Sequence, residues 1–243
     1  MSSPDMDRLQ EGSRPMNIFT WNMQGSKAST ELAWNTGVAP LMRDQAEAVC
    51  CLQECGAVPE SATAVHSPDP NVRLYNWGGT HSRPGYWIAW YQSDPHGNRC
   101  NLAVVSSTKV QPQGVRVVKA AGAHQWRPAL GVDFGGIEVF SIHAISPGGP
   151  DARGLLEAVS GAVPSGKPWV AAGDFNREPG ITGFHCHAPK RPTFNANNAT
   201  PDRKLDWCAT SAAYPELEGE VITGLQRSDH YPVLYAGIST AEQ

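Results

Sequence analysis

The sequence predicts a layered α/β sandwich in which most strands pair antiparallel. About ten short segments have the apolar or alternating pattern of β-strands, and only two stretches have helical spacing. Twenty-four glycines and 20 prolines among 243 residues supply the turns that many short strands need. Because helices are too few to connect so many strands in parallel, we expect mostly antiparallel sheets packed in layers.

One domain is expected from residue 16 to residue 238, because no linker and no internal repeat divides the chain. The first 15 residues are polar, contain Pro4 and Pro15, and lack the apolar region of a secretory signal, so we expect a flexible lead-in there. No apolar run is long enough to span a membrane. The net charge of −4 argues against strong non-specific binding to nucleic acid, but metal-binding carboxylates would contribute to this charge.

The first half of the chain is expected to hold a helix and four strands. The helical pattern lies within residues 34–49, is strongest at 41–48, and leads directly into an apolar strand. Turn-forming residues at 95–98 separate two of the strands. The four strands are expected at 17–21, 48–53, 86–91 and 101–106.

The second half is expected to hold the other helix and the remaining strands. Asp151 is in position to cap a helix that continues through residues 153–159. Gly135 and Gly136 form a tight hairpin turn between two strands. The strands are expected at 115–119, 130–134, 137–143, 169–172, 205–209 and 232–236.

The six cysteines are expected to act as small buried apolar residues. Cys50 and Cys51 are neighbours in an expected strand and therefore point to opposite faces of the sheet. The sequence contains no C-x-x-C pair, and the His-Cys-His run at 185–187 lacks the partner spacing of known zinc sites. We therefore expect no zinc site.

Three polar residues stand at the ends of separate expected strands. Asn22 can orient a carboxylate or a phosphate oxygen, although an asparagine near Gly25 is also an ordinary turn residue. Glu54 follows an apolar run and suits Mg²⁺, which prefers one or two carboxylates, although a surface glutamate at a strand end is equally ordinary. His143 ends a strand, where a single histidine is more often structural than catalytic.

The motifs Gly-Asp-Phe-Asn at 173–176 and Ser-Asp-His at 228–230 carry the remaining candidates. Asp174 and Asn176 are two residues apart, so in an extended chain their side chains project from one side. Asp206 lies between apolar neighbours, and such a carboxylate needs a partner, for which a histidine is the natural choice. The side chains of Asp229 and His230 diverge, so that one can face a metal and the other a scissile phosphate.

The ordered set of these residues resembles the endonuclease/exonuclease/phosphatase superfamily typified by deoxyribonuclease I. More specifically, the chain resembles the active-subunit family of the cytolethal distending toxins, CdtB. The similar segments span residues 17–235 and their order is specific. They are TWNMQGS at 20–26, LQECG at 52–56, SRP at 82–84, NRCNLAVVS at 98–106, RPA at 127–129, HA at 143–144, GG at 148–149, GDFNR at 173–177, LD at 205–206 and SDHYPV at 228–233.

The resemblance implies a four-layer sandwich of two β-sheets flanked by helices and a Mg²⁺-dependent cleavage of DNA phosphodiesters, with Mn²⁺ as a substitute. It makes Glu54, Asn22 and Asp229 the metal ligands. The implied catalytic residues are His143, Asp174, Asn176, Asp206 and His230, with His230, oriented by Asp206, as the base and Asp174 as its rival. The implied substrate contacts are Arg99, Asn101 and Arg127.

The chain departs from its resemblance in several ways. It is shorter than typical toxin subunits, has more cysteines and shows no export signal, although the family is secreted and acts in the nucleus of a target cell. The resemblance implies a monomeric catalytic unit, with DNA and unseen delivery subunits as its partners. The alternatives are a phosphoinositide phosphatase or other phospholipid phosphodiesterase with the same metal site, and a non-catalytic binding module. Asn176-Arg177-Glu178 stands where inositol phosphatases carry Asn-Tyr-Arg, which favours a nuclease.

Overall fold

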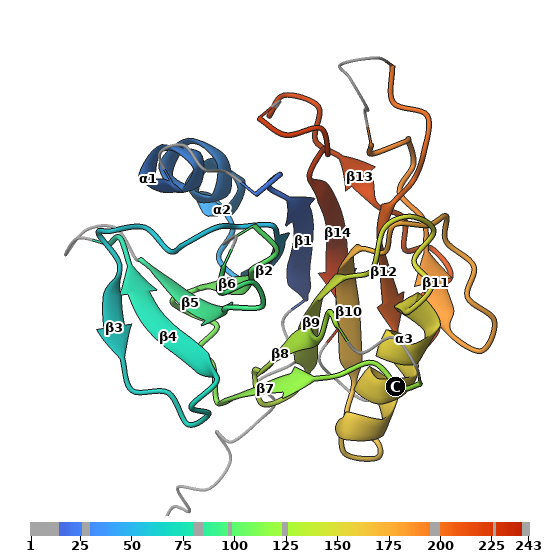
Figure 1. Ribbon diagram of the computed structural model, residues 1–243, viewed down its shortest axis with the longest axis horizontal. Coiled ribbons are helices and arrows are strands. Elements are labelled where there is room, and N and C mark those ends of the chain that lie inside the picture. The colour runs from blue at the N-terminus through green and yellow to red at the C-terminus, as the bar shows by residue number, and fades with distance from the viewer. Residues whose placement is uncertain are drawn as a thin grey trace, which may run out of the picture.

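The computed structural model describes residues 15–25, 30–79, 85–96, 99–122, 126–194, 200–225 and 227–239. Two β-sheets pack face to face, and helices cover the outer face of each sheet, so the molecule has four layers (Figure 1). The predicted α/β sandwich is confirmed. The expected lead-in lies outside the described residues except for Pro15, and the single domain over 16–238 stays a prediction.

The larger sheet has eight strands in the order β13-β14-β1-β2-β6-β5-β4-β3. Strands β1 and β2 are parallel, and the other neighbouring pairs are antiparallel. The strands are β1 (Met16–Asn22), β2 (Ala48–Gln53), β3 (Thr63–Val65), β4 (Val72–Trp77), β5 (Tyr86–Tyr91), β6 (Leu102–Ser107), β13 (Glu220–Val221) and β14 (Val233–Ile238).

The smaller sheet has six strands in the order β11-β12-β10-β9-β8-β7. Strands β9 and β10 are parallel, and the other neighbours pair antiparallel. The strands are β7 (Gly114–Val118), β8 (Ala129–Asp133), β9 (Glu138–His143), β10 (Trp169–Asp174), β11 (His185–His187) and β12 (Asp206–Thr210). The predicted predominance of antiparallel pairing is confirmed in both sheets.

Four strands were not predicted from the sequence. Strands β3, β11 and β13 contain only two or three residues, too few for a periodic pattern to show. Strand β4 is longer, but its exposed residues Arg73 and Asn76 lie on opposite faces, so its sequence shows no regular alternation of apolar and polar residues.

The first helical region begins earlier and ends earlier than predicted. It consists of α1 (Thr30–Ala33), the π-helical turn η1 (Trp34–Val38) and α2 (Ala39–Met42). Pro40 has no N–H to donate within a regular α-helix, which explains the local change of helix type. A Cβ atom on Gly37 would lie 2.7 Å from the ring of Trp21, so this turn packs closely on β1.

The second helix, α3 (Ala152–Ala162), is confirmed, but its predicted cap is not. Asp151 stands at the N-cap position without a side-chain capping bond, and its Oδ1 accepts a hydrogen bond from the N–H of Ile145 instead. Helix α3, yellow in Figure 1, and the region of α1 and α2, blue, lie on opposite sides of the molecule. None of the described helices is long and apolar enough to cross a membrane.

Three hydrophobic clusters fill the spaces between the four layers. One lies between the two sheets, one lies under α1 and α2, and one lies under α3. Cys51 belongs to the first cluster and Cys50 to the second, which confirms that they point to opposite faces. All six cysteines are free; Cys100 and Cys186 are half-buried, and the other four are buried. His187 hydrogen-bonds Thr210 at 2.8 Å, a structural contact.

Candidate active site

Eight strand ends gather the predicted site residues at one edge of the sandwich. The parallel pairs β1–β2 and β9–β10 place their carboxyl ends at this edge. The antiparallel neighbours β6, β8, β12 and β14 begin at the same edge. The residues at or next to these strand ends are Asn22, Glu54, Asn101, Arg127, His143, Asp174, Asn176, Asp206, Asp229 and His230.

His230 is held between two carboxylates. Its Nδ1 lies 2.8 Å from Oδ2 of Asp206, and its Nε2 lies 3.7 Å from Oδ2 of Asp174. All three side chains are buried. Burial alone would lower the pKa of His230, but the charges of Asp206 and Asp174 outweigh it and raise the pKa to about 9. The imidazole is therefore protonated at neutral pH, and the histidine partner expected for Asp206 is His230.

Asp174 is the point where the two sheets meet. Nδ2 of Asn22, from the larger sheet, donates to its Oδ2 at 3.0 Å. Asn176 donates from Nδ2 to the same oxygen at 3.1 Å and from its backbone N–H to Oδ1 at 2.8 Å. Burial, and then the charge of Asp206, raise the pKa of this carboxyl well above its ordinary range. A carboxylate that is oriented by three donors and has a raised pKa is suited to accept a proton.

Unusual backbone geometry is concentrated at this edge. Within the described chain, three residues other than glycine have a positive φ: Gln24 at 60°, Glu54 at 47° and Asn176 at 52°. Asn22 Oδ1 accepts the N–H of Gln24 at 2.9 Å. Residues in this sparsely populated region persist only where the surrounding structure holds them, and such strain is frequent at functional sites.

His143 has a guanidinium at hydrogen-bond distance, where His230 has a carboxylate. Its Nε2 lies 2.7 Å from Nη1 of Arg127, which can only donate, so the proton of the neutral ring resides on Nδ1. The same Nε2 lies 3.7 Å from Oε1 of Glu54 and 3.8 Å from Oδ2 of Asp174. Burial, followed by the charges of Arg127 and His230, holds the pKa of His143 well below its usual value. His143 is therefore neutral at pH 7.

Glu54 lies beside His143 and reaches toward solvent. Its side chain is 16% exposed, and its Oε2 lies 3.8 Å from Nη2 of Arg99, whose side chain is 59% exposed. Burial raises the pKa of Glu54, although Arg99 and Arg127 oppose this shift. A Cβ atom on Gly25 would lie 2.9 Å from Oε2 of Glu54, so only glycine leaves the carboxylate this room.

The comparisons with known proteins agree with this geometry. The family described as the endonuclease/exonuclease/phosphatase family matches residues 19–230. The chain belongs to this family. The CdtB chain of the cytolethal distending toxin of Escherichia coli is 32% identical to it over 243 residues, which cover 89% of each chain. The CdtB homologue of Salmonella typhi is 34% identical over 244 residues, covering 90% of this chain and 88% of that protein.

A solved structure gives the same result. A chain in the crystal structure of the Haemophilus ducreyi cytolethal distending toxin superposes with a TM-score of 0.77 at 28% identity, covering 92% of this chain and 98% of that one. The predicted resemblance is confirmed. As a homologue of CdtB within the endonuclease/exonuclease/phosphatase family, the chain is an enzyme of the phosphodiesterase and nuclease class with the deoxyribonuclease I-like fold.

The closest group of ligand atoms in the described chain differs from the predicted metal ligands. Asp174, Asp206 and His230 each place a ligand atom within 4.8 Å of the others. However, Nδ1 of His230 is hydrogen-bonded to Oδ2 of Asp206, and Nε2 lies 3.7 Å from Oδ2 of Asp174, so each ring nitrogen already faces a carboxylate. We therefore interpret this group as a histidine clamped between carboxylates.

The predicted ligands Glu54, Asn22 and Asp229 fit a hard divalent cation better by the chemistry of their donor atoms. Glu54 supplies a partly buried carboxylate whose pKa is raised by burial, and a cation would reverse that shift. Asn22 and Asp229 supply further oxygen atoms, the ligands that Mg²⁺ prefers. The backbone oxygen of Asn22 accepts a hydrogen bond from Ser228 at 2.7 Å, which ties the segment of Asp229 to Asn22. These three ligands stay a prediction.

Asn101 lies in a different environment from the one expected of a phosphate contact. It is fully buried at the start of β6. Its Nδ2 donates to the oxygen of Gly56 at 3.0 Å, and its Oδ1 accepts the N–H of Asp94 at 3.2 Å. Because its amide joins the loop that follows Glu54 to the loop before Arg99, Asn101 braces the site from below.

Residues outside the predicted set of catalytic, metal and substrate residues support His230. The Nε1 of Trp21 donates to the carbonyl of His230 at 3.1 Å, and Oγ of Ser228 accepts its N–H at 3.1 Å. The ring of Phe194 packs against the imidazole with a centroid distance of 4.8 Å. Ser228, two residues before the histidine, is a known turn signal, but Trp21 is 209 residues away and carries no local signal.

A buried amide also joins the two sheets below the site. Nε2 of Gln53 in β2 donates to Oγ of Ser141 in β9 at 2.9 Å, and Oγ of Ser141 donates to the oxygen of Leu52 at 2.9 Å. Thr20 Oγ1 completes the network with a hydrogen bond to Oε1 of Gln53 at 3.3 Å. The network fixes the offset between the parallel pairs whose ends carry Glu54 and His143.

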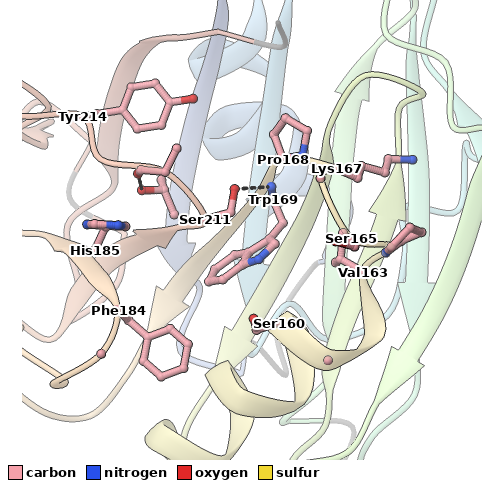
Figure 2. A pocket seen from close by; sticks show the side chains of 16 residues that line it. Ser160, Val163, Ser165, Lys167, Pro168, Trp169, Phe184, His185, Ser211 and Tyr214 are labelled. Carbon is pink, nitrogen blue, oxygen red and sulfur yellow. Dashed lines mark hydrogen bonds between the residues drawn. The ribbon is translucent and has the colours of Figure 1, made fainter. Parts of the chain in front are cut away.

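The large hollow at the other end of the smaller sheet is separate from this site. It has a volume of about 900 Å³ and lies between the end of α3, the start of β10 and the end of β12 (Figure 2). Trp169, whose backbone N–H donates to Oγ of Ser211 at 3.0 Å, is one of the residues that line it. Asp174 is five residues further along β10, about 17 Å away in an extended strand.

Proposed function

We propose that this enzyme is a Mg²⁺-dependent endonuclease that hydrolyses DNA phosphodiester bonds, with Mn²⁺ able to replace Mg²⁺. The observation that carries the proposal is the pair of histidines around Asp174. His230, between two carboxylates, is protonated, and His143, beside Arg127, is neutral. Both imidazoles face the carboxylate of Asp174. The protonated ring of His230 can act as an acid, and the neutral ring of His143 can donate or accept a hydrogen bond.

In the proposed reaction, Asp174 accepts the proton of the attacking water. The pKa of Asp174 is raised toward neutral pH, which makes its carboxylate a better proton acceptor. Protonated His230 has no free nitrogen with which to accept a proton. Asn22 and Asn176 hold the carboxylate in one orientation. This assignment favours Asp174 over His230 as the base, the choice that the sequence left open.

His230 then supplies positive charge and a proton next to Asp174, 3.7 Å from its Oδ2. Asp206 keeps the ring protonated and fixes its orientation, so its Nε2–H can stabilise a phosphoryl oxygen or protonate the leaving oxygen. Neutral His143, with its Nε2 held by Arg127, lies on the side of Glu54. A Mg²⁺ ion held by Glu54, Asn22 and Asp229 would supply Lewis-acid stabilisation of the phosphate charge.

Three observations support DNA over a phospholipid headgroup. Residues 176–178 read Asn-Arg-Glu, without the Asn-Tyr-Arg run of inositol phosphatases. The guanidinium of Arg99 is 59% exposed beside Glu54, where it can meet a phosphate next to the scissile one. Arg127 presents a second cation on the other side of Glu54, at His143.

The relatives also bear on the setting of the reaction. The Escherichia coli relative is a toxin subunit and the Salmonella typhi protein is a homologue of it, so we infer a secreted protein that is delivered by partner subunits and cuts DNA in the nucleus of a target cell. The catalytic unit itself is expected to act as a monomer, because all the site residues come from one chain.

A plasmid assay tests the proposal. The purified chain should nick supercoiled DNA in Mg²⁺ or Mn²⁺ and stop in EDTA. A preparation of Asp174→Asn, purified in the same way, should show little nicking and so controls for a contaminating nuclease. The same preparations should be tested for release of phosphate from phosphoinositides and headgroups from phospholipids. Lipid hydrolysis without DNA nicking would replace the proposal, and nicking in EDTA would exclude the metal-dependent reaction.

A further inference from the structure

One aromatic ring joins an exposed arginine to the imidazole of His230. The Cζ atom of Arg203 lies 4.6 Å from the ring centroid of Phe194, and the ring centroids of Phe194 and His230 are 4.8 Å apart. A guanidinium over an aromatic face is attracted by the quadrupole of the ring. The guanidinium of Arg203 is therefore held one side chain away from His230.

The backbone places this arginine at the same end of the sandwich as the site. Isolated β-bridges join Phe194 to Arg203 and to His230. The carbonyl of Arg203 accepts the N–H of Thr193 at 2.8 Å and that of Phe194 at 3.2 Å. Arg203 also stands three residues before Asp206, the first residue of β12. It therefore lies just beyond the strand end that carries the carboxylate partner of His230.

The guanidinium of Arg203 is open to a second partner. Its side chain is 52% exposed, and its Nε lies 3.6 Å from Oδ1 of Asp202, whose side chain is 75% exposed. An exposed ion pair of this kind is weak and is screened by salt, so it does not prevent the guanidinium from binding a phosphate through charge-assisted hydrogen bonds. Because the ring of Phe194 already orders the side chain, less rotational freedom is lost when a phosphate binds.

We propose that Arg203 binds a backbone phosphate that flanks the scissile one, and that Phe194 positions its guanidinium for this contact. The inference rests on the proposed nuclease function and adds a substrate-binding residue next to His230. A DNA strand carries a phosphate at every nucleotide, so a strand with its scissile phosphate at His230 presents further phosphates to its surroundings. The contact identifies Arg203 as a residue that distinguishes a polymer from a small phosphodiester.

The charge of the molecule gives such a contact weight. The chain carries a net charge of −4, so its general attraction to the phosphate backbone is weak. Binding of DNA then depends on individual cations close to the site. Arg99 is exposed beside Glu54, and Arg203 is exposed beside the ring that packs on His230. The two arginines have different neighbours, so we expect them to bind different phosphates of the strand.

A change in the substrate tests the contact at a single phosphate. An end-labelled duplex carries one methylphosphonate, which is uncharged, and the rate of cleavage at each bond is read from a sequencing gel under single-hit conditions. For the native chain, cleavage should fall several-fold when the neutral group stands at a fixed position relative to the cut bond. Arg203→Ala should cleave DNA several-fold more slowly and should be insensitive to the neutral group at that position. Arg99→Ala should lose its sensitivity at a different position.

A binding experiment gives a readout that does not need cleavage. Asp174→Asn, which is expected to nick little, is titrated into a fluorescein-labelled duplex over a range of salt concentrations, and anisotropy is followed. Adding Arg203→Ala should reduce the slope of log affinity against log salt by about 0.9, because one fewer counterion is released. Arg203→Lys, which keeps the charge, should retain the slope, and so should Arg153→Ala, which removes a charge from α3.

The role of Phe194 is tested by Phe194→Leu, which removes the ring under the guanidinium. This variant should lose part of the dependence on the same phosphate, while hydrolysis of a small phosphodiester reports whether His230 is disturbed as well. Equal losses on DNA and on the small diester would overturn the positioning role, because the ring would then act through His230 alone.

Three results would overturn the contact of Arg203 with DNA. The first is a pattern of methylphosphonate sensitivity and a salt slope that are both unchanged in Arg203→Ala. The second is an equal loss in Arg203→Ala on DNA and on the small diester, which would make the guanidinium a support for the imidazole. The third is a loss of phosphoinositide hydrolysis with no effect on DNA, which would assign the guanidinium to a lipid headgroup.

The two assays together distinguish failure of this inference from failure of the proposed function. Cleavage of DNA by the native chain, with Arg203→Ala unchanged in both assays, would reject the contact and leave the nuclease intact. A native chain that cuts no DNA would reject the proposed function, and the salt slope of binding would then decide on Arg203 separately. A chain that neither cuts nor binds DNA would reject both.

Discussion

The two histidines of the site occupy opposite electrostatic environments. His143 ends β9 beside the guanidinium of Arg127, and His230 precedes β14 between the carboxylates of Asp206 and Asp174. Both rings are buried, so burial disfavours the protonated form of each. The neighbouring charge decides the outcome, because it lowers the pKa of His143 further and raises that of His230 to about 9.

The difference shows how one edge of a sandwich provides two protonation states at the same pH. The strand ends supply similar backbone positions, and the charged partner of each ring sets its chemistry. Arg127 lies two residues before β8, the strand antiparallel to β9. Asp206 begins β12 of the smaller sheet and bonds His230, which precedes β14 of the larger sheet. One histidine thus takes its charged partner from its own sheet and the other from the opposite sheet, so the two charges are set independently.

The largest expected effect is the loss of either ring. His143→Ala and His230→Ala should each lower kcat for plasmid nicking by at least about 10²-fold, the usual contribution of a general acid or base. His185→Ala is the matched control, because that histidine is exposed on β11 at the far end of the smaller sheet, and it should retain full activity. Thermal melting must accompany the kinetics, since both site histidines are buried.

Near-normal cleavage by a folded variant of either histidine would show that its ring is not needed for the reaction. Such a result at His143 alone would reduce its role to holding Arg127 and Glu54. A result at His230 alone would leave Asp174 as the acid and base of the reaction.

The second effect, from Asp206→Asn, tests the cause of the charge on His230. Without this carboxylate the pKa of His230 should fall toward its ordinary value of 6.5, and cleavage should drop by about 10- to 100-fold, as is usual when the orienting partner of a functional histidine is removed. Because the folded pKa of His230 exceeds its unfolded value, its stabilisation is complete below pH 6.5 and is lost as the pH rises to about 9.

The measurement is the free energy of unfolding between pH 6 and pH 10. Asp174 adds a change of the same sign, because its pKa is also raised in the folded state and it too binds protons more strongly than in the unfolded chain. The native protein should therefore lose stability with rising pH, and Asp206→Asn should lose less. Equal slopes for the two proteins would show that Asp206 does not hold the proton on His230.

How far the sequence predicts such a site depends on which kind of contact is involved. The positions of Asn22, Glu54, His143 and Asp174 at strand ends were predictable, because an apolar run followed by a polar residue marks a strand end in the sequence itself. The pairing of Asp206 with a histidine was predictable too, because a carboxylate between apolar neighbours needs a partner.

The rest depends on contacts between distant parts of the chain. The burial of Asn101 follows from the way two loops close over β6, and the bond from Trp21 to His230 joins residues 209 positions apart. The close packing of the first helical region on β1 depends on the fit of Gly37 against the ring of Trp21. Local periodicity contains no information on these contacts, which arise when the two sheets and their loops pack together.

The third effect concerns the charge beside His143. Arg127→Gln should raise the pKa of His143, although burial, the larger cause, will still hold it below its usual value. Loss of a charge-assisted hydrogen bond of ~1.5–3 kcal/mol predicts a decrease in kcat/KM of about ten-fold or more. The ring protons of His143 in an NMR titration report the pKa directly. If the titration of His143 is unchanged, Arg127 acts on the substrate alone and does not set the state of the ring.

The smallest expected effect is at Arg99, which is not a partner of either histidine. Its guanidinium is 59% exposed and lies 3.8 Å from Glu54, so we expect it to grip a phosphate beyond the scissile group. Arg99→Ala should weaken DNA cleavage several-fold and reduce the slope of log kcat/KM against log salt by about 0.9, because one fewer counterion is released on binding. Hydrolysis of a small phosphodiester, which has no flanking phosphate, should fall much less.

Arg153→Ala is the control for the change of charge. Arg153 is exposed on α3 far from the site, so its loss removes the same charge and should leave the salt slope as it is. Equal losses on DNA and on the small diester would show that Arg99 takes part in the chemical step beside Glu54. Its role as a contact to a phosphate beyond the scissile group would then be wrong, and Arg99 would belong to the same reacting centre as the two histidines.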